Sequence, residues 1–334
     1  MRYGLAFCLC LFTSILSAAE VNVYSARKEG LIKPLLLQFE ANTGTKVNLI
    51  TGNADTLLQR LISEGKNSPA DVLITTDVGR LYRAQKAKVL QTIHSETLEN
   101  SIPEQYRDPQ GYWFGLSLRT RPIVYAVDRV TPEQLSTYEA LGNPEWKQKI
   151  CIRSSDNIYN QSLVASLIAH LDEEKTLAWA SALVKNFARP PQGGDRDQIK
   201  AVAAGQCDIA VVNNYYLGIM LASKDKTEQK AANQVRIFWP NQNDRGVHVN
   251  ISGGAVTASS KNKDSAIALL EFLASDTAQQ WYAETNLEYP IKPGVQPSEI
   301  LKSWGEFKAD TLSLYRLGEL NAQAVMIMDH AKWK

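Results

Sequence analysis

Apolar and polar residues alternate along most of the chain in two regular patterns. Residues 21–26 (VNVYSA) alternate between apolar and polar positions, which predicts a strand. Residues 30–44 carry apolar residues at helical spacing and end at a glycine, which predicts a helix with its stop signal. The same patterns predict further strands at 45–52, 70–77, 149–154 and 207–214, and further helices at 54–65, 79–89, 159–171, 174–187, 195–205 and 263–275.

This alternation of strands and helices is typical of an α/β fold with mostly parallel sheets. Two more strand-like stretches, residues 121–128 and 249–258, lie between blocks of the alternation, and we interpret them as crossovers. The chain then forms two lobes, each a mostly parallel sheet flanked by helices, joined by a two-strand hinge with a cleft between them. The predicted first lobe takes in residues 20–121 and about 252–300, and the second takes in residues 126–248 and about 301–334.

The first 19 residues have the pattern of a cleavable signal peptide. A basic Arg2 precedes an apolar run from Leu5 to Leu16, and residues 17–19 (SAA) fit the small-residue cleavage pattern. The run is short for a membrane-spanning helix, and no later stretch is apolar enough to span a bilayer. We therefore expect an exported, soluble protein that begins near Glu20.

Charge and cysteine content narrow the function further. One of the 36 Lys and Arg residues lies in the signal peptide, which leaves 35 against 35 Asp and Glu, so the mature chain is neutral. A nucleic-acid surface, which needs clustered positive charge, is not expected. Two of the 4 cysteines remain in the mature chain, Cys151 and Cys207, each in a predicted core strand. They form either a disulfide, as an oxidising compartment favours, or two buried thiols.

Common catalytic motifs are missing from the sequence. It contains no GxSxG, HExxH, P-loop or GxGxxG motif, and it suggests no Cys–His nucleophile pair. The 4 histidines are scattered along the chain and do not form the clusters that zinc sites use: His94, His170, His248 and His330. We therefore expect a binding protein rather than an enzyme.

Tyrosines follow the predicted strands of the second half. Tyr215 and Tyr216 close the strand at 207–214, and Tyr159 follows the strand at 149–154. Ligands of open α/β sheets bind beyond the carboxyl ends of the strands, so these side chains are expected to face the cleft. The adjacent pair is either ordinary packing of two rings or two phenolic oxygens aimed at a ligand.

A phenolate is a hard, anionic oxygen donor. Its ordinary pKa is about 10, so only a strongly polarising cation keeps it ionised at neutral pH. Fe(III) is the natural candidate, and three phenolates balance its charge. Remaining coordination positions go to water or to a small anion, held by the forked donors of an arginine. Arg27 and Tyr24 lie at the end of the first predicted strand, and Arg119 lies just before the first crossover.

Seven segments of the mature chain carry a family resemblance: VNVYSARKEGLIKPLLLQFEANTGTKVNLITG, LLQRLISEGKNSPADVLITTDVGRLYRA, GLSLRTRPIVYA, CIRSSDNIYNQSLVASLIAH, RPPQGGDRDQIKAVAAGQCDIAVVNNYYLG, HVNISGGAVTASSKNKDSAIALLEFLAS and ILKSWGEFKAD. They resemble the ferric-iron-binding periplasmic proteins of ABC transporters, which have the type II periplasmic-binding fold. The likeness covers essentially the whole mature chain.

This resemblance implies a carrier, acting as a monomer, that captures Fe(III) between its lobes. The carrier delivers the metal to an inner-membrane ABC permease and its ATPase. The family's adjacent tyrosine ligands correspond to Tyr215 and Tyr216, and a further tyrosine ligand corresponds to Tyr159. The arginine that holds a carbonate-like synergistic anion corresponds to Arg27, with Arg119 as a second candidate.

The chain departs from the family at one point. Some members place a His, or His-Tyr, directly after that arginine, where this chain has Lys28 and Glu29. We therefore expect an all-tyrosine site from the second lobe, and we keep Tyr24 and Glu29 as weaker candidate ligands. The alternative is a binding protein for an oxyanion or organic acid without metal. The residues that this alternative uses are Arg27, Arg119, Ser154 and Ser155.

Overall fold

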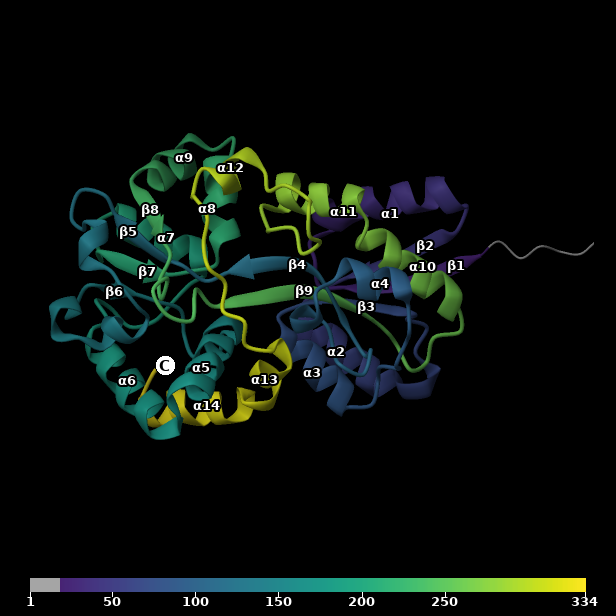
Figure 1. Ribbon diagram of the computed structural model, residues 1–334, viewed down its shortest axis with the longest axis horizontal. Helices are drawn as coiled ribbons and strands as arrows, with labels where there is room; N and C mark the ends of the chain where they lie inside the picture. The colour runs from purple at the N-terminus through teal and green to yellow at the C-terminus, as the bar shows by residue number, and fades with distance from the viewer. Residues whose placement is uncertain (1–18) are drawn as a thin grey trace, which may run out of the picture.

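The computed structural model describes residues 19–334, and its strands form two sheets that lie side by side (Figure 1). The first sheet has the order β2 (Lys46–Thr51), β1 (Glu20–Ser25), β3 (Val72–Thr76), β9 (Val249–Val256), β4 (Phe114–Thr120). The second has the order β6 (Ile150–Cys151), β7 (Ile209–Val211), β5 (Ile123–Ala126), β8 (Val235–Phe238). The predicted signal peptide falls on residues 1–18, outside the described residues, and on Ala19.

Helices flank both sheets, which confirms the predicted two-lobe α/β fold. Those of the first lobe are α1 (Glu29–Thr43), α2 (Ala54–Glu64), α3 (Val78–Lys86), α4 (Glu96–Ser101), α10 (Lys263–Leu273) and α11 (Asp276–Trp281). In Figure 1, α1 and α11 lie above the first sheet and α2 and α3 lie below it. Those around the second sheet are α5 (Ile158–Leu171), α6 (Glu173–Lys185), α7 (Asp195–Ala203), α8 (Asn214–Leu221) and α9 (Lys226–Asn233).

The sheets are mixed, which corrects the expectation of mostly parallel strands. In the first sheet β1 runs parallel to β2 and β3, but β9 is antiparallel to both β3 and β4. In the second sheet β7 is parallel to β6, while β5 is antiparallel to β7 and β8. Strands that return from the other lobe enter a sheet in the opposite direction, and the polarity pattern of a strand carries no information on its direction.

The chain passes between the sheets at the start of the first predicted crossover and directly before the second. Residues 121–122 connect β4 to β5, and residues 239–248 connect β8 to β9. The two passages are tied together, because the Arg121 amide donates to the His248 carbonyl at 3.1 Å. The Tyr138 hydroxyl donates to the Arg121 carbonyl at 2.7 Å and accepts from the His248 amide at 3.2 Å. These bonds fix the two connections relative to each other and leave the lobes on either side of them.

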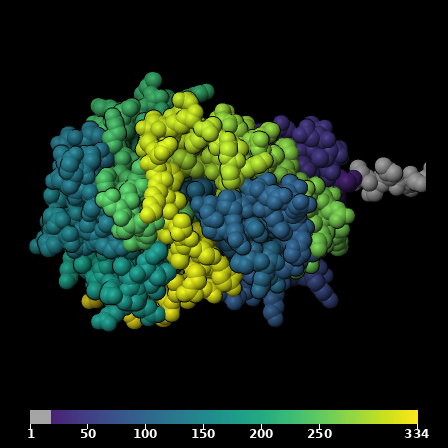
Figure 2. Space-filling view, in the orientation of Figure 1, coloured from purple at the N-terminus to yellow at the C-terminus, as the bar shows by residue number. Residues whose placement is uncertain are grey.

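The C-terminal segment closes the side of the molecule where the lobes meet, as the yellow segment of Figure 2 shows. It contains α12 (Glu299–Lys302), α13 (Leu314–Glu319) and α14 (Asn321–His330). Helix α13 packs against both α3 and α5, and α14 packs on α5 and α6. Gly318 lies directly on the Tyr82 side chain, where a Cβ would come within 2.4 Å of that residue's Cβ. The C-terminus therefore packs on both lobes.

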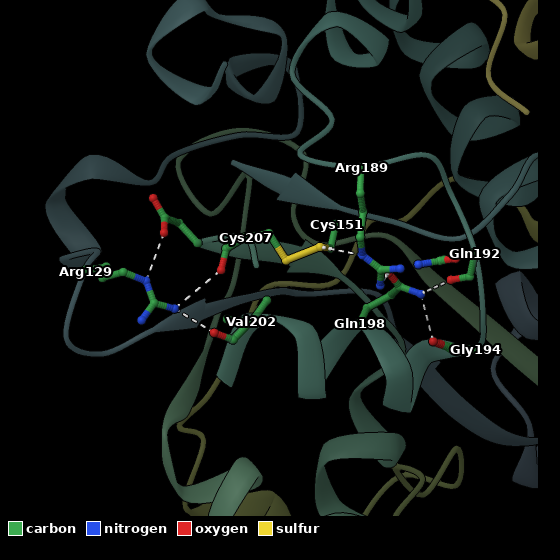
Figure 3. The surroundings of a disulfide bond; sticks show 9 residues. Arg129, Cys151, Arg189, Gln192, Gly194, Gln198, Val202 and Cys207 are labelled. Atoms are coloured by element: carbon green, nitrogen blue, oxygen red, sulfur yellow. Dashed lines mark hydrogen bonds and ion pairs between the residues drawn. A yellow bond between two sulfur atoms is a disulfide. The ribbon is translucent and has the colours of Figure 1, made fainter. Parts of the chain in front are cut away.

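Cys151 and Cys207 form a disulfide, with their Cα atoms 5.8 Å apart (Figure 3). The bond joins the short strand β6 to the segment before β7, inside a small apolar core around the second sheet. Arg189 Nε donates to the Cys151 sulfur at 3.4 Å. Of the two alternatives that the sequence leaves open, the structure has the disulfide.

Replacing both cysteines by serine is expected to lower the free energy of unfolding by about 4 kcal/mol, because a 56-residue separation closes a long loop in the unfolded chain. Denaturant titrations of the double variant and of the oxidised parent measure the difference. Adding reductant to the parent should reproduce the loss, and a loss below about 1 kcal/mol would contradict the expectation.

Candidate functional site

The adjacent tyrosines lie at the start of a helix. Strand β7 ends at Val211 and α8 begins at Asn214, so Tyr215 and Tyr216 occupy its first turn rather than the end of a longer strand. Successive helical residues are about 100° apart around the axis, against 180° in a strand, so both rings can turn to one side. Their centroids are 4.3 Å apart with the planes at 34°.

Asn214 fixes this helix start to the first lobe. Its side-chain oxygen accepts from the Thr120 amide of β4 at 2.9 Å, and its amide nitrogen donates to the Leu287 carbonyl at 3.2 Å. The helix then passes close to Leu287, because a Cβ on Gly218 would lie 2.9 Å from a Leu287 methyl carbon. The backbone that carries the tyrosine pair is therefore held by the same chain segments that carry the first lobe's polar groups.

Tyr159 joins the pair from the first turn of a second helix, α5. The Tyr215 hydroxyl donates to the Tyr159 hydroxyl at 3.4 Å. Both helices present their N-terminal ends here, where the helix dipole favours negative charge. The structure thus brings together the three tyrosines that the sequence predicts as ligands.

A cavity of about 320 Å³ lies in front of these rings, between the lobes. The second sheet's helices contribute Tyr159, Arg196, Tyr215, Tyr216 and Ile219 to its lining. The opposite wall consists of Ala26, Arg27, Lys28, Leu31, Thr76, Arg119, Thr285, Asn286 and Glu288. A ligand in this cavity contacts phenolic oxygens on one side and guanidinium groups on the other.

The phenols of the pair hold their protons tightly. Burial, followed by the neighbouring phenols Tyr159 and Tyr216, raises the pKa of Tyr215 well above its ordinary value. Burial also raises the pKa of Tyr216, with Tyr159 as the next cause. Without a cation in the cavity both therefore remain neutral at physiological pH.

Arg27 is buried, and both of its terminal guanidinium nitrogens donate hydrogen bonds to protein groups. Its guanidinium forms an ion pair with Glu288 at 2.8 Å and donates to the Ser117 hydroxyl at 2.7 Å. The same group stacks over the Tyr282 ring, 5.0 Å from its centre. Its exposed fraction is 4%, so Arg27 is held mainly by the protein itself.

Arg119 lies across from the tyrosines and keeps free donors. Its guanidinium carbon is 5.3 Å from the centre of the Tyr215 ring and 5.6 Å from that of Tyr159. One nitrogen, Nη2, bonds Ser252 and lies 3.4 Å from Glu288. Among the described residues Nε and Nη1 have no hydrogen-bond partner, although the side chain is almost completely buried. Of the two arginines on this wall, Arg119 has two nitrogens without a partner in the described part of the chain and Arg27 has only Nε, so Arg119 offers more donors to a ligand.

Glu288, which sequence reasoning missed, connects the two arginines. Burial alone would raise the pKa of its carboxyl, but the charges of Arg27 and Arg119 outweigh burial and lower it to about 2. Ser117 and Ser252 also donate to this carboxylate. The sequence holds no local signal for this contact, because 261 residues separate Glu288 from Arg27.

A second missed cluster supports Tyr159 from behind. Arg121 and Arg153 both pair with the fully buried Asp195, and each guanidinium carbon lies 5.9 Å from the Tyr159 ring centre. Asp195 also accepts from the Asn213 amide at 2.9 Å, at the residue before α8. This cluster links the α7 helix start to the helix starts that carry the tyrosines.

Two weaker candidates lie elsewhere. The Tyr24 hydroxyl donates to the Glu64 carboxylate at 3.0 Å, and Glu29 pairs with Lys33 on the helix surface at 2.7 Å. Both line a different cavity of about 410 Å³ beside the edge strand β2. Of the two residues directly after Arg27, Lys28 lines the tyrosine cavity and Glu29 does not. Ser154 and Ser155 line neither of these two cavities.

Glu29→Gln is expected to leave ferric affinity unchanged within about twofold. Glu29 lies in the first turn of α1, where an acidic residue favours the helix dipole, and its exposed ion pair contributes little to stability. A chelator competition titration on the variant and the parent measures the ratio. A loss of tenfold or more would make Glu29 a ligand after all.

Two negative findings hold for residues 19–334. They contain no group of three or more His, Cys, Asp or Glu side chains arranged to hold a metal ion. Within the same range, no helix combines the length and the apolar character needed to cross a bilayer.

Known proteins are similar over nearly the whole chain. The family described as bacterial extracellular solute-binding protein matches residues 67–303. Iron uptake protein A1 of Synechocystis is 50% identical over 315 residues, which cover 94% of this chain and 88% of that protein. A Trichodesmium protein (IdiA, FutA) solved with iron and citrate ligands has a TM-score of 0.92 and 50% identity, covering 95% of this chain and 100% of that chain. The ferric binding protein of Campylobacter jejuni has a TM-score of 0.90 and 38% identity, covering 94% of this chain and 100% of that chain.

Proposed function

The chain belongs to the family of bacterial extracellular solute-binding proteins, and from this premise we propose that it is the ferric-iron-binding component of an ABC importer. It is a carrier rather than an enzyme, as its relatives are named for iron uptake and iron binding. Fe(III) is its transported substrate.

One observation carries the assignment: three phenolic hydroxyls line one side of a cavity whose other side holds a buried arginine with free donors. We propose Tyr159, Tyr215 and Tyr216 as the metal ligands, each bound as a phenolate. Three phenolates neutralise a 3+ ion, and oxygen-only anionic donors favour Fe(III) over Fe(II). Reduction therefore weakens binding and aids release.

An anion completes the coordination from the opposite wall. We propose carbonate or a similar synergistic anion, hydrogen-bonded by the free Nε and Nη1 donors of Arg119. Arg27 supports this wall through its pair with Glu288, so its contribution to the anion is mainly electrostatic. The relative from Trichodesmium holds citrate with its iron, which supports an anion-assisted site in this chain.

All three proposed ligands come from helices of the second lobe, so metal binds there before the lobes close over it. The bound metal then shifts an existing open–closed equilibrium toward the closed state.

We propose the lobe limits given above, 20–121 with about 252–300 and 126–248 with about 301–334, and a monomeric carrier. Its place of work is the periplasm, and its partners are an inner-membrane permease and the associated ATPase, as the family implies.

Iron retention after desalting tests the function. The purified protein is mixed with ferric citrate and bicarbonate, passed through a desalting column, and its iron content is measured. We expect about one ferric ion per chain, and fewer when bicarbonate and citrate are both left out of the loading step. Protein that retains no iron but is stabilised by oxyanions alone would instead support the alternative, an oxyanion or organic-acid binding protein without metal.

A further inference from the structure

Glu288 is a buried carboxylate beside the proposed anion site. Its Oε2 accepts from Arg27 Nη2 at 2.8 Å, and its Oε1 accepts from Arg27 Nη1 at 3.3 Å. The same Oε1 lies 3.4 Å from Arg119 Nη2. Ser117 and Ser252 complete its hydrogen bonds. The residue is 4% exposed and lines the cavity, so the protein places a fixed negative charge directly beside the proposed anion site.

The Glu288 charge lowers the net positive charge that the first-lobe wall of the cavity presents to a ligand. Arg27 and Arg119 together carry two positive charges, and Glu288 cancels one of them. Two further cations line the cavity, but Lys28 is exposed and Arg196 lies 3.5 Å from Glu228. Exposed charges are screened by water and salt, whereas a buried carboxylate is screened much less.

We propose that Glu288 determines the charge selectivity of anion capture at Arg119. By cancelling one guanidinium charge and holding both guanidiniums in place, it keeps the affinity for anions low and limits the advantage of multiply charged anions over singly charged ones. This inference rests on the proposed function, in which an anion shares the cavity with iron. A weakly held anion is also one that leaves readily when the metal is released.

Coulomb's law gives the inference a quantitative form. Removing one negative charge near the site strengthens binding in proportion to the charge of the anion. If Glu288→Gln improves the affinity for formate by about tenfold, it should improve the affinity for sulfate by the square of that factor, about hundredfold. A residue that serves only to hold the fold together would change both affinities by the same factor or lower both.

The test measures formate and sulfate affinity by calorimetric titration of the metal-free protein. Glu284→Gln is the matched control, because it removes an exposed carboxylate in the same segment and should change neither affinity. Equal factors for formate and sulfate in Glu288→Gln, or no gain in either, overturn the inference. Iron retention by the parent is measured separately, so a failed function and a failed inference give different results.

Glu288→Gln leaves the buried Arg27 charge without its partner, which destabilises the fold. A second pair of variants, in which this charge is also removed, tests the inference without that loss of stability. Arg27→Gln removes one positive charge and should lower sulfate affinity by about hundredfold and formate affinity by about tenfold. Adding Glu288→Gln to it removes the negative charge as well and should restore both affinities to within about threefold of the parent. If the double variant stays as weak as Arg27→Gln alone, Glu288 does not set the selectivity.

Discussion

Tyr215→Phe is expected to lower the affinity for ferric iron by more than about hundredfold. The substitution removes one of three proposed phenolate ligands while keeping the ring that stacks on Tyr216. Even the outer hydrogen-bond partners of metal ligands contribute tenfold to hundredfold to affinity, so a lost ligand should exceed that range. Competition with a chelator of known affinity measures the change, and the visible charge-transfer absorption should fall with it.

Tyr24→Phe is the matched control for this variant. Its hydroxyl is also buried and hydrogen-bonded, but to Glu64 and beside a different cavity. Ferric affinity should stay at the parent value in Tyr24→Phe. If Tyr215→Phe and Tyr216→Phe both keep the full affinity and colour, the proposed ligand set is wrong.

Ferric affinity is expected to fall by at least about hundredfold for each unit that the pH drops between 8 and 6. Burial raises the phenol pKa of both Tyr215 and Tyr216, so both are protonated in the metal-free protein across this range. Both become phenolates when the metal binds, so binding releases at least two protons. Each released proton makes the affinity change by about tenfold per pH unit, in the direction of weaker binding at lower pH.

Chelator competition at several pH values, corrected for the protonation of the chelator, gives the number of protons directly. Tyr216→Phe provides the control, because its slope should be lower than that of the parent by one proton. A parent affinity that does not change with pH would mean that neutral groups bind the metal.

The fold is predictable from the sequence wherever one residue pattern determines one element. The strand at 21–26 and the helix at 30–44 are confirmed as β1 and α1, because each follows one clear period, two residues in the strand and about 3.6 in the helix. The pattern does not predict β4, since all seven of its residues are buried, including Ser117 and Arg119. A sequence pattern assigns polar residues such as these to a loop, because it does not show the buried groups to which they bond.

The two halves of the site differ in how far the sequence predicts them. Tyr215 and Tyr216 are adjacent and follow a strand, so their common location needs only local geometry. Arg119 and Glu288 are 169 residues apart, and their contact depends on the order of the strands in the first sheet. The sequence therefore predicts the phenols well, but it does not predict which arginine keeps free donors.

The lobes are coupled close to the proposed metal ligands. The Asn214 side chain forms hydrogen bonds with Thr120 and Leu287. Thr120 directly precedes the passage to the second sheet, and Leu287 directly precedes Glu288, whose carboxylate pairs with the two arginines. Asp77, a buried residue of the first lobe, accepts from the Ser162 hydroxyl of α5 at 2.7 Å. A ligand that draws the tyrosines toward Arg119 therefore acts on contacts that already join the two lobes.

The central claim is that phenolate oxygens hold ferric iron in this cavity. Resonance Raman spectroscopy of the iron-loaded protein, excited within its visible absorption band, tests this claim most directly. We expect an orange-red protein whose spectrum shows tyrosinate vibrations, which weaken in Tyr215→Phe and persist in Tyr24→Phe. Iron retained without a visible band and without tyrosinate vibrations would contradict it.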